Sequence, residues 1–164
     1  MNFKSITRLA AALTLSLAAM SASATQVTSN FDATLTVVSS CTIAAANLPF
    51  GSTPGQITAN IDASSSITVN CNPGSAYNVL LSAGTGTGST VSARKMNSGV
   101  NVVSYQLYRD AGRTQVWGST IGTDTVSGTG AGANQTLTVY GRVPSGQSVV
   151  NGSYSSTVTA AVDF

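Results

Sequence analysis

Residues 26–38 read Gln-Val-Thr-Ser-Asn-Phe-Asp-Ala-Thr-Leu-Thr-Val-Val and lie just ahead of the first cysteine. Apolar or small residues occupy the odd positions, and polar residues occupy most of the even ones. This is the period of two that characterises a half-buried strand. The odd positions are Val27, Ser29, Phe31, Ala33, Leu35 and Val37. The stretch is therefore predicted to be a strand with one apolar face.

The last segment, residues 154–164, repeats this alternation. Its apolar face consists of Tyr154, Val158, Ala160, Val162 and Phe164. A strand with an apolar face is stable only when it is paired and covered, so both outer strands are expected to need a partner.

Residues 1–24 have the pattern of a signal peptide. Lys4 and Arg8 precede an apolar run, and the stretch ends in Ala22-Ser-Ala24, a small-x-small site that signal peptidase cleaves. An uncleaved membrane anchor is the alternative, but the apolar run is short for a span. The mature chain is expected to begin near Thr25 and to be exported.

Composition points to one all-β domain. Serine, threonine, glycine and valine dominate and glutamate is absent, so good helix formers are scarce. Without Lys4 and Arg8, five basic residues face five aspartates, and no basic cluster remains. Nucleic acid is therefore not an expected partner.

The two cysteines, Cys41 and Cys71, are expected to form one disulfide. An even number of cysteines in an exported chain favours a structural bridge. A metal site is the alternative, but with no histidine and two thiols the usual set of four ligands cannot be assembled.

Further strands are predicted between the two end segments. Residues 67–71 and 77–81 alternate on either side of Asn72-Pro-Gly-Ser and resemble a hairpin. Residues 102–108 and 136–143 also alternate, whereas 47–55 contain two prolines and indicate an irregular edge. Strands at this spacing, without helical periodicity, favour an antiparallel sandwich of immunoglobulin-like type.

Catalytic patterns are weak. Ser92-Ala-Arg-Lys95 fits the S-x-x-K of penicillin-recognising enzymes but lacks the K-T-G partner motif and the expected helix. Carboxylate pairs would have to come from Asp32, Asp62, Asp110, Asp124 and Asp163, which lie in predicted turns or on polar strand faces. No enzyme activity, cofactor or metal is expected.

A set of motifs resembles the spore coat protein U domain family, which includes the pilins of archaic, Csu-type chaperone-usher pili. These motifs are Tyr105-Gln-Leu-Tyr-Arg-Asp110, Arg113, Trp117-Gly118, Tyr140-Gly-Arg-Val-Pro144 and Gly152-Ser-Tyr154. The likeness covers the whole mature chain, including the placement of the cysteines.

The resemblance implies an immunoglobulin-like sandwich that lacks its last strand. A neighbouring subunit would complete it by donor-strand exchange, with residues 25–38 as the donor and residues 39–164 as the pilin domain. The donor contacts would be the odd positions from Val27 to Val37, and residues Tyr154, Val158, Ala160, Val162 and Phe164 would line part of the acceptor groove.

The same resemblance implies the partners and the location. Other pilin subunits, a periplasmic chaperone and an outer-membrane usher would bind the chain on its way to the cell surface. Adhesion and biofilm formation would be roles of the assembled fibre.

Two other classes of function stay open. The opening strand could fold back onto its own domain and give a secreted sandwich that serves as a coat component or binds carbohydrate. A secreted hydrolase would require a pocket that gathers two of the aspartates.

Overall fold

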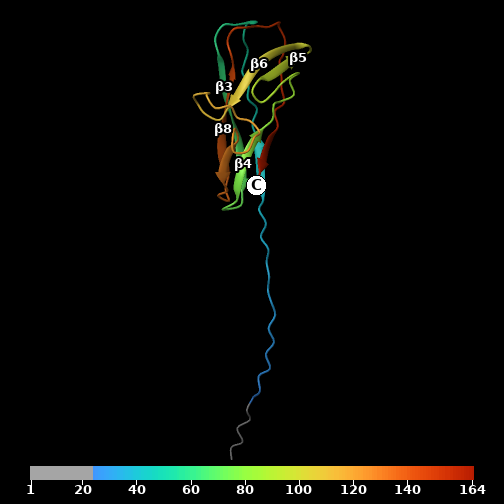
Figure 1. The fold of residues 1–164 in the computed structure, drawn as a ribbon, viewed down its shortest axis with the longest axis vertical. Coiled ribbons are helices and arrows are strands. Elements are labelled where there is room, and N and C mark those ends of the chain that lie inside the picture. The colour runs from blue at the N-terminus through green and yellow to red at the C-terminus, as the bar shows by residue number, and fades with distance from the viewer. Residues whose placement is uncertain (1–23) are drawn as a thin grey trace, which may run out of the picture. The chain divides into compact units, whose positions relative to one another are not determined.

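The computed structural model describes residues 24–164, so nearly all of the predicted signal peptide lies outside the described residues. The chain divides after Thr36, and residues 37–164 form one compact unit built from strands (Figure 1). Among residues 24–164 there is no helix that is long and apolar enough to cross a membrane.

Strands of the domain form two main sheets. The larger has the order β1 (Cys41–Ala45), β3 (Ile61–Cys71), β8 (Gln135–Val143), β6 (Asn101–Tyr108) and β5 (Arg94–Ser98). The smaller has the order β10 (Ala160–Asp163), β4 (Ala76–Leu81) and β7 (Val126–Thr129), and β2 (Gln56–Ile57) pairs separately with β9 (Gln147–Ser148). Every pairing is antiparallel, which confirms the predicted all-β antiparallel class.

One apolar core joins the two sheets. Its strand residues are the alternating ones that the sequence indicates: Ile67, Val69 and Cys71 on β3, Tyr77, Val79 and Leu81 on β4, and Val103, Tyr105 and Leu107 on β6. Trp117 is also buried, and its indole N–H donates a 2.9 Å hydrogen bond to the carbonyl oxygen of Val79. The bond satisfies a polar group that would otherwise be buried without a partner.

The hairpin predicted around residues 72–75 is wrong. β3 and β4 belong to different sheets, and the turn carries the chain from one sheet across to the other. Both strands alternate because each turns one face toward the shared core. An arch between facing sheets and a hairpin within one sheet have the same periodicity, so the pattern could not separate them.

The predicted disulfide between Cys41 and Cys71 is present, with the two Cα atoms 4.1 Å apart. The two residues are register partners at the first position of β1 and the last position of β3. A bridge across a sequence separation of 30 residues contributes about 3 to 4 kcal/mol in the chain-entropy model. It fastens β1, an edge strand, to the rest of its sheet.

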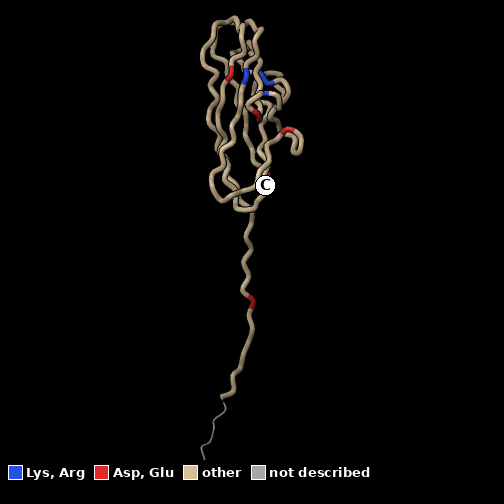
Figure 2. The backbone as a smooth tube through the Cα atoms, turned by 90° about the vertical axis from the view of Figure 1, so that its left-hand side faces the viewer, with Lys and Arg blue, Asp and Glu red and all other residues tan. Residues whose placement is uncertain are grey.

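The outer face of β3 and β8 carries an ion-pair cluster. Arg142 donates from Nε and Nη2 to the two carboxylate oxygens of Asp62 at 2.7 and 2.9 Å, and Arg113 lies 3.3 Å from the same carboxylate. The hydrogen bond from Arg142 is the main cause that lowers the pKa of Asp62. Figure 2 shows basic and acidic residues near one another on the domain, with no extended run of one sign.

Replacing Asp62 by asparagine should make stability less sensitive to acid. Because the pKa of Asp62 is lower in the folded chain than in the unfolded chain, the contribution of the carboxylate is complete well above pH 4. It is lost as the pH falls through the folded-state pKa. Urea unfolding of both proteins between pH 7 and pH 2.5 should show their difference shrinking with acid, and a constant difference would contradict the assignment.

Candidate strand-binding groove

Each main sheet has an unpaired edge on the same side of the domain. Among the described residues, β1 pairs with β3 alone and β10 pairs with β4 alone. The two edge strands lie next to each other without pairing (Figure 1). An unpaired edge presents free backbone N–H and C=O groups, so each edge can offer hydrogen bonds to an added strand.

Two cavities begin where β1 ends and β10 starts. One has a volume of about 320 Å³ and lies between the chain after β1 and the chain before β10. The other, of about 670 Å³, continues from it and shares Leu48, Phe50 and Met96 as lining residues. We call these two connected cavities the groove. Its floor consists of core residues from both sheets, among them Ile67, Leu81, Tyr105, Leu107, Val103 and Val143.

The first wall of the groove is the irregular stretch predicted at residues 47–55. Leu48 and Phe50 line both cavities, and the ring of Phe50 packs edge-on against Tyr105 with the centroids 6.1 Å apart. A Cβ atom on Gly141 would come within 2.8 Å of both Leu48 and Phe50. The glycine therefore leaves the space in which these two side chains lie against β8.

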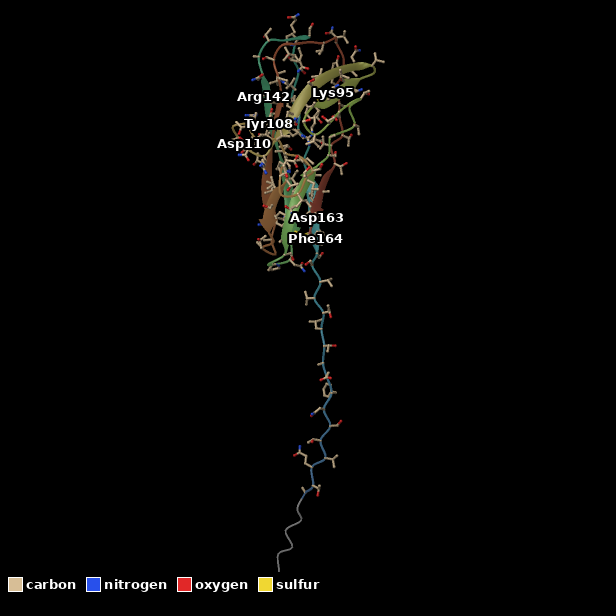
Figure 3. All side chains as sticks on the ribbon, viewed as in Figure 1. Lys95, Tyr108, Asp110, Arg142, Asp163 and Phe164 are labelled. Atoms are coloured by element: carbon tan, nitrogen blue, oxygen red, sulfur yellow. A yellow bond between two sulfur atoms is a disulfide. The ribbon has the colours of Figure 1, made fainter. Side chains whose placement is uncertain are left out.

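The second wall is the C-terminal segment, in which residues 160–163 form β10 and the preceding residues form no strand. Of the five residues predicted on the groove face, Tyr154, Val158 and Ala160 line the cavities. Val162 is half-buried on β10 beyond the lining, and Phe164 at the end of the chain is 55% exposed (Figure 3).

Hydrogen bonds hold one side of this wall to the domain. Ser155 exchanges backbone hydrogen bonds with Asn97, and the N–H groups of Thr157 and Thr159 donate to side chains of the 82–85 loop. Successive residues of an extended chain direct their backbone groups to opposite sides. The backbone groups of Ser156 and Val158 are therefore left for a strand on the open side.

The opening segment, residues 24–36, belongs to a unit separate from the domain. Residues 24–40 form no strand, unlike the sequence expectation, since a strand requires backbone pairing and no described residue supplies it. The side chains of its predicted apolar face are exposed, with Val27 at 92%, Phe31 at 90% and Leu35 at 88%. Ser29, Ala33 and Val37 on the same face are exposed as well.

The domain fixes the chain where this segment ends. Asn72 donates from its side chain to the carbonyl of Val38 and from its backbone to the carbonyl of Ser40, at 3.1 and 3.0 Å. Residues before Val38 have no such hydrogen bond among those described. The predicted division between donor strand and domain near residue 38 stays a prediction, and these bonds show where the domain begins to hold the chain.

Acidic side chains serve turns and ion pairs away from the groove. Asp110 accepts hydrogen bonds from the backbone of Thr114 and Gln115, and the bond from Gln115 is the main cause that lowers its pKa (Figure 3). The Asp124 carboxylate accepts a bond from the backbone of Thr120. No aspartate lines either cavity. Within residues 24–164 there is no group of three metal-ligating side chains.

Sequence reasoning named one wall of the groove and missed the other wall and the floor. Leu48 and Phe50 are apolar residues on either side of Pro49. They are a short example of the alternation that marks the predicted strands. The floor residues were assigned to strands, but nothing in the pattern showed that part of the core would be open.

The sequence matches one family model and one curated protein. The family model described as Spore Coat Protein U domain matches residues 27–161. Protein U of Myxococcus xanthus is 38% identical over 81 residues, which cover 48% of this chain. The match spans 45% of that protein's length, less than half of it.

One solved structure shows a similar fold. A chain in the crystal structure of the CsuC-CsuE chaperone-tip adhesion subunit pre-assembly complex from archaic chaperone-usher Csu pili of Acinetobacter baumannii aligns with a TM-score of 0.56. It is 22% identical, over 79% of this chain and 41% of that one. The minor tip subunit HdaB of the E. coli Hda pilus aligns at a TM-score of 0.41 with 18% identity, over 74% of this chain and 79% of that one.

Proposed function

Because this chain belongs to the spore coat protein U domain family, we propose that it is a structural subunit of a surface pilus assembled by the chaperone-usher pathway. One subunit would donate residues 25–38 to the groove of the next. Adhesion and biofilm formation would then be properties of the fibre, and the chain would have no enzymatic role.

The observation that carries the proposal is the groove between the chain after β1 and the chain before β10. β-strand addition needs free backbone groups for affinity and apolar pockets at alternate positions for specificity. The C-terminal wall supplies the free backbone groups at Ser156 and Val158, and the core residues of the floor supply the apolar surface. The solved relative that contains a chaperone with a pilus subunit has this fold, which is consistent with the proposal.

The opening segment has an exposed apolar face that could cover the apolar floor of the groove. Phe31 and Leu35 lie two pleats apart on its exposed apolar face, and burial of each contributes about 1.5 to 3 kcal/mol. Binding between a segment on one copy and a groove on another is a head-to-tail contact. Such contacts produce filaments when they do not close into a ring.

The groove also explains why a chaperone and an usher would be partners. Before assembly, open edges beside an apolar floor would pair with other chains in the periplasm and aggregate. A chaperone strand that occupies the groove prevents this, and exchange at the outer-membrane usher then replaces it by the donor strand. The predicted location is therefore the cell surface, reached through the periplasm.

Replacing Val158 by aspartate tests the groove. The substitution places a charge on the wall of the smaller cavity, where an incoming strand would bury it. We expect copurification of the subunit with its chaperone to fall by more than about tenfold, since each 1.4 kcal/mol corresponds to a factor of ten in affinity.

Thr159→Asp is the matched control, because Thr159 is the next residue and its side chain is exposed. This variant should bind the chaperone as the wild type does. Equal binding by both variants would contradict the assignment of this cleft as the acceptor groove.

A further inference from the structure

Two buried hydroxyl groups in the groove have no hydrogen-bond partner. These are the phenol oxygen of Tyr105 on the floor and the side-chain oxygen of Ser156 on the C-terminal wall. Tyr105 is 5% exposed. A buried hydroxyl without a partner is unfavourable and is rare in folded proteins, so this pair requires an explanation.

The two oxygens lie close to the same residue, Gly84. A Cβ atom on Gly84 would lie 2.5 Å from the Ser156 oxygen and 3.1 Å from the Tyr105 oxygen. Gly84 has a φ of +83°, a conformation that favours glycine, so this loop position contributes no side chain that could pair with them. The hydroxyls thus form one polar position in a groove whose other contacts are largely apolar.

The opening segment has one matching polar residue. On its groove-facing positions the other residues are valine, phenylalanine, alanine and leucine, and Ser29 is the exception. We propose that Ser29 of a neighbouring copy lies against Tyr105 and Ser156, and that their hydrogen bonds fix the register of the donor strand. This inference rests on the proposed function, because it assumes that the groove receives residues 25–38 of another copy.

Apolar contacts alone leave the register open. A slip of two residues keeps the same face of a strand turned toward the groove, so it exchanges one apolar side chain for another. A slip in either direction would place Val27 or Phe31 against the two hydroxyls and leave them unpaired. A slip of four residues would place Ala33 there with the same result.

The direction of the donor strand follows from the ends of the domain. Cys41 is paired with Cys71 and Asp163 with Asn78, so the start of β1 and the end of β10 both lie beside the 72–75 turn. Each donor segment joins its own domain at that end. A growing fibre needs this end free for the next copy, so the donor strand must leave the groove at the opposite end and run antiparallel to β10.

Direction and register together place the larger side chains. With Ser29 beside Ser156, an antiparallel strand directs Val27 toward Val158 and Phe31 toward Tyr154. Val158 belongs to the cavity of about 320 Å³ and Tyr154 to the cavity of about 670 Å³. The phenyl ring of Phe31, and Leu35 beyond it, then enter the larger space.

Cysteine cross-linking of assembled fibres tests the register. The full chain is coexpressed with its chaperone and usher as Ser29→Cys with Ser156→Cys, and sheared fibres are oxidised with copper phenanthroline. Opposed residues on adjacent strands have Cβ atoms close enough for a disulfide. We expect multimers that survive boiling and collapse with reductant. Phe31→Cys and Ala33→Cys, each with Ser156→Cys, are the matched controls and should give no such multimers.

The outcomes distinguish failure of the register inference from failure of the proposed function. Cross-linked multimers from either control would overturn the register while supporting strand exchange, and so would intact fibres in which the Ser29 pair does not cross-link. If no variant, nor the wild type, forms multimers on an unheated gel, the proposed function fails and the register inference fails with it.

A second measurement does not depend on new cysteines. Ser29→Ala, and Tyr105→Phe with Ser156→Ala, should each speed dissociation of the fibre at a fixed temperature by about tenfold, because each leaves a buried hydroxyl unpaired. The variant that combines all three changes should dissociate no faster than either alone. Effects that multiply would contradict the contact.

Discussion

Replacing Phe31 and Leu35 together by aspartate should abolish polymerisation and leave a subunit that still binds its chaperone. Both side chains lie on the exposed apolar face of the opening segment. In the groove each aspartate would be buried without a partner, which costs far more than the lost apolar contact. The multimers on an unheated denaturing gel of sheared surface material would report the effect.

Thr34→Asp with Thr36→Asp is the matched control. It introduces the same charge into the same segment, but on the face that an incorporated strand turns away from the groove. This variant should assemble. Loss of multimers in both variants would indicate that charge, and not strand docking, controls assembly, and would contradict the proposed role of the apolar face.

Replacing Arg94 by methionine should lower the free energy of unfolding by about 3 to 5 kcal/mol. Arg94 is fully buried on β5, and its guanidinium donates to the carbonyl oxygens of Leu81, Ser82 and Trp117 and to the side chain of Gln106. Burial lowers the pKa of this guanidinium. Removing it leaves several buried acceptors without a donor, and urea unfolding of the purified chain would measure the loss.

Lys95→Met provides the control for this experiment. Lys95 is the next residue on β5, and among the described hydrogen bonds its side chain makes none. A small change in unfolding free energy is expected there. Equal losses for the two substitutions would show that the strand, and not the buried guanidinium, is sensitive to methionine.

Alternation predicts most strands of the domain, because a strand with one buried face has apolar residues at every second position. The expected strands at 67–71, 77–81, 102–108 and 136–143 all lie within or overlap β3, β4, β6 and β8. Alternation reports the buried face of a strand but not its partner. This is why alternation predicts a hairpin between β3 and β4, where the chain in fact crosses between the sheets.

The two ends were predicted as strands and are only partly so. Residues 24–40 form no strand and only residues 160–163 of the C-terminal segment do, although both segments alternate. A pattern shows what a segment can bury, whereas hydrogen-bond pairing requires a neighbour. In the proposed fibre that neighbour is another copy, which one sequence does not contain.

Polar details of the interior could not be read from the sequence. Arg94 belongs to a residue type that is normally exposed, and nothing around it indicated a buried guanidinium. Likewise Tyr105 was predicted on the core face, but its unpaired hydroxyl depends on where the 84–86 loop and the C-terminal wall meet. Contacts between distant segments determine such features.

The most direct test of the central claim compares fibres from the wild type with those from a chain lacking residues 25–38. Material sheared from the cell surface is run on a denaturing gel, unheated and boiled. The account predicts a ladder of multiples in the unheated wild type that collapses on boiling and is absent from the deletion. A wild type that runs as a monomer under both conditions, or a deletion that still forms the ladder, would contradict donor-strand assembly.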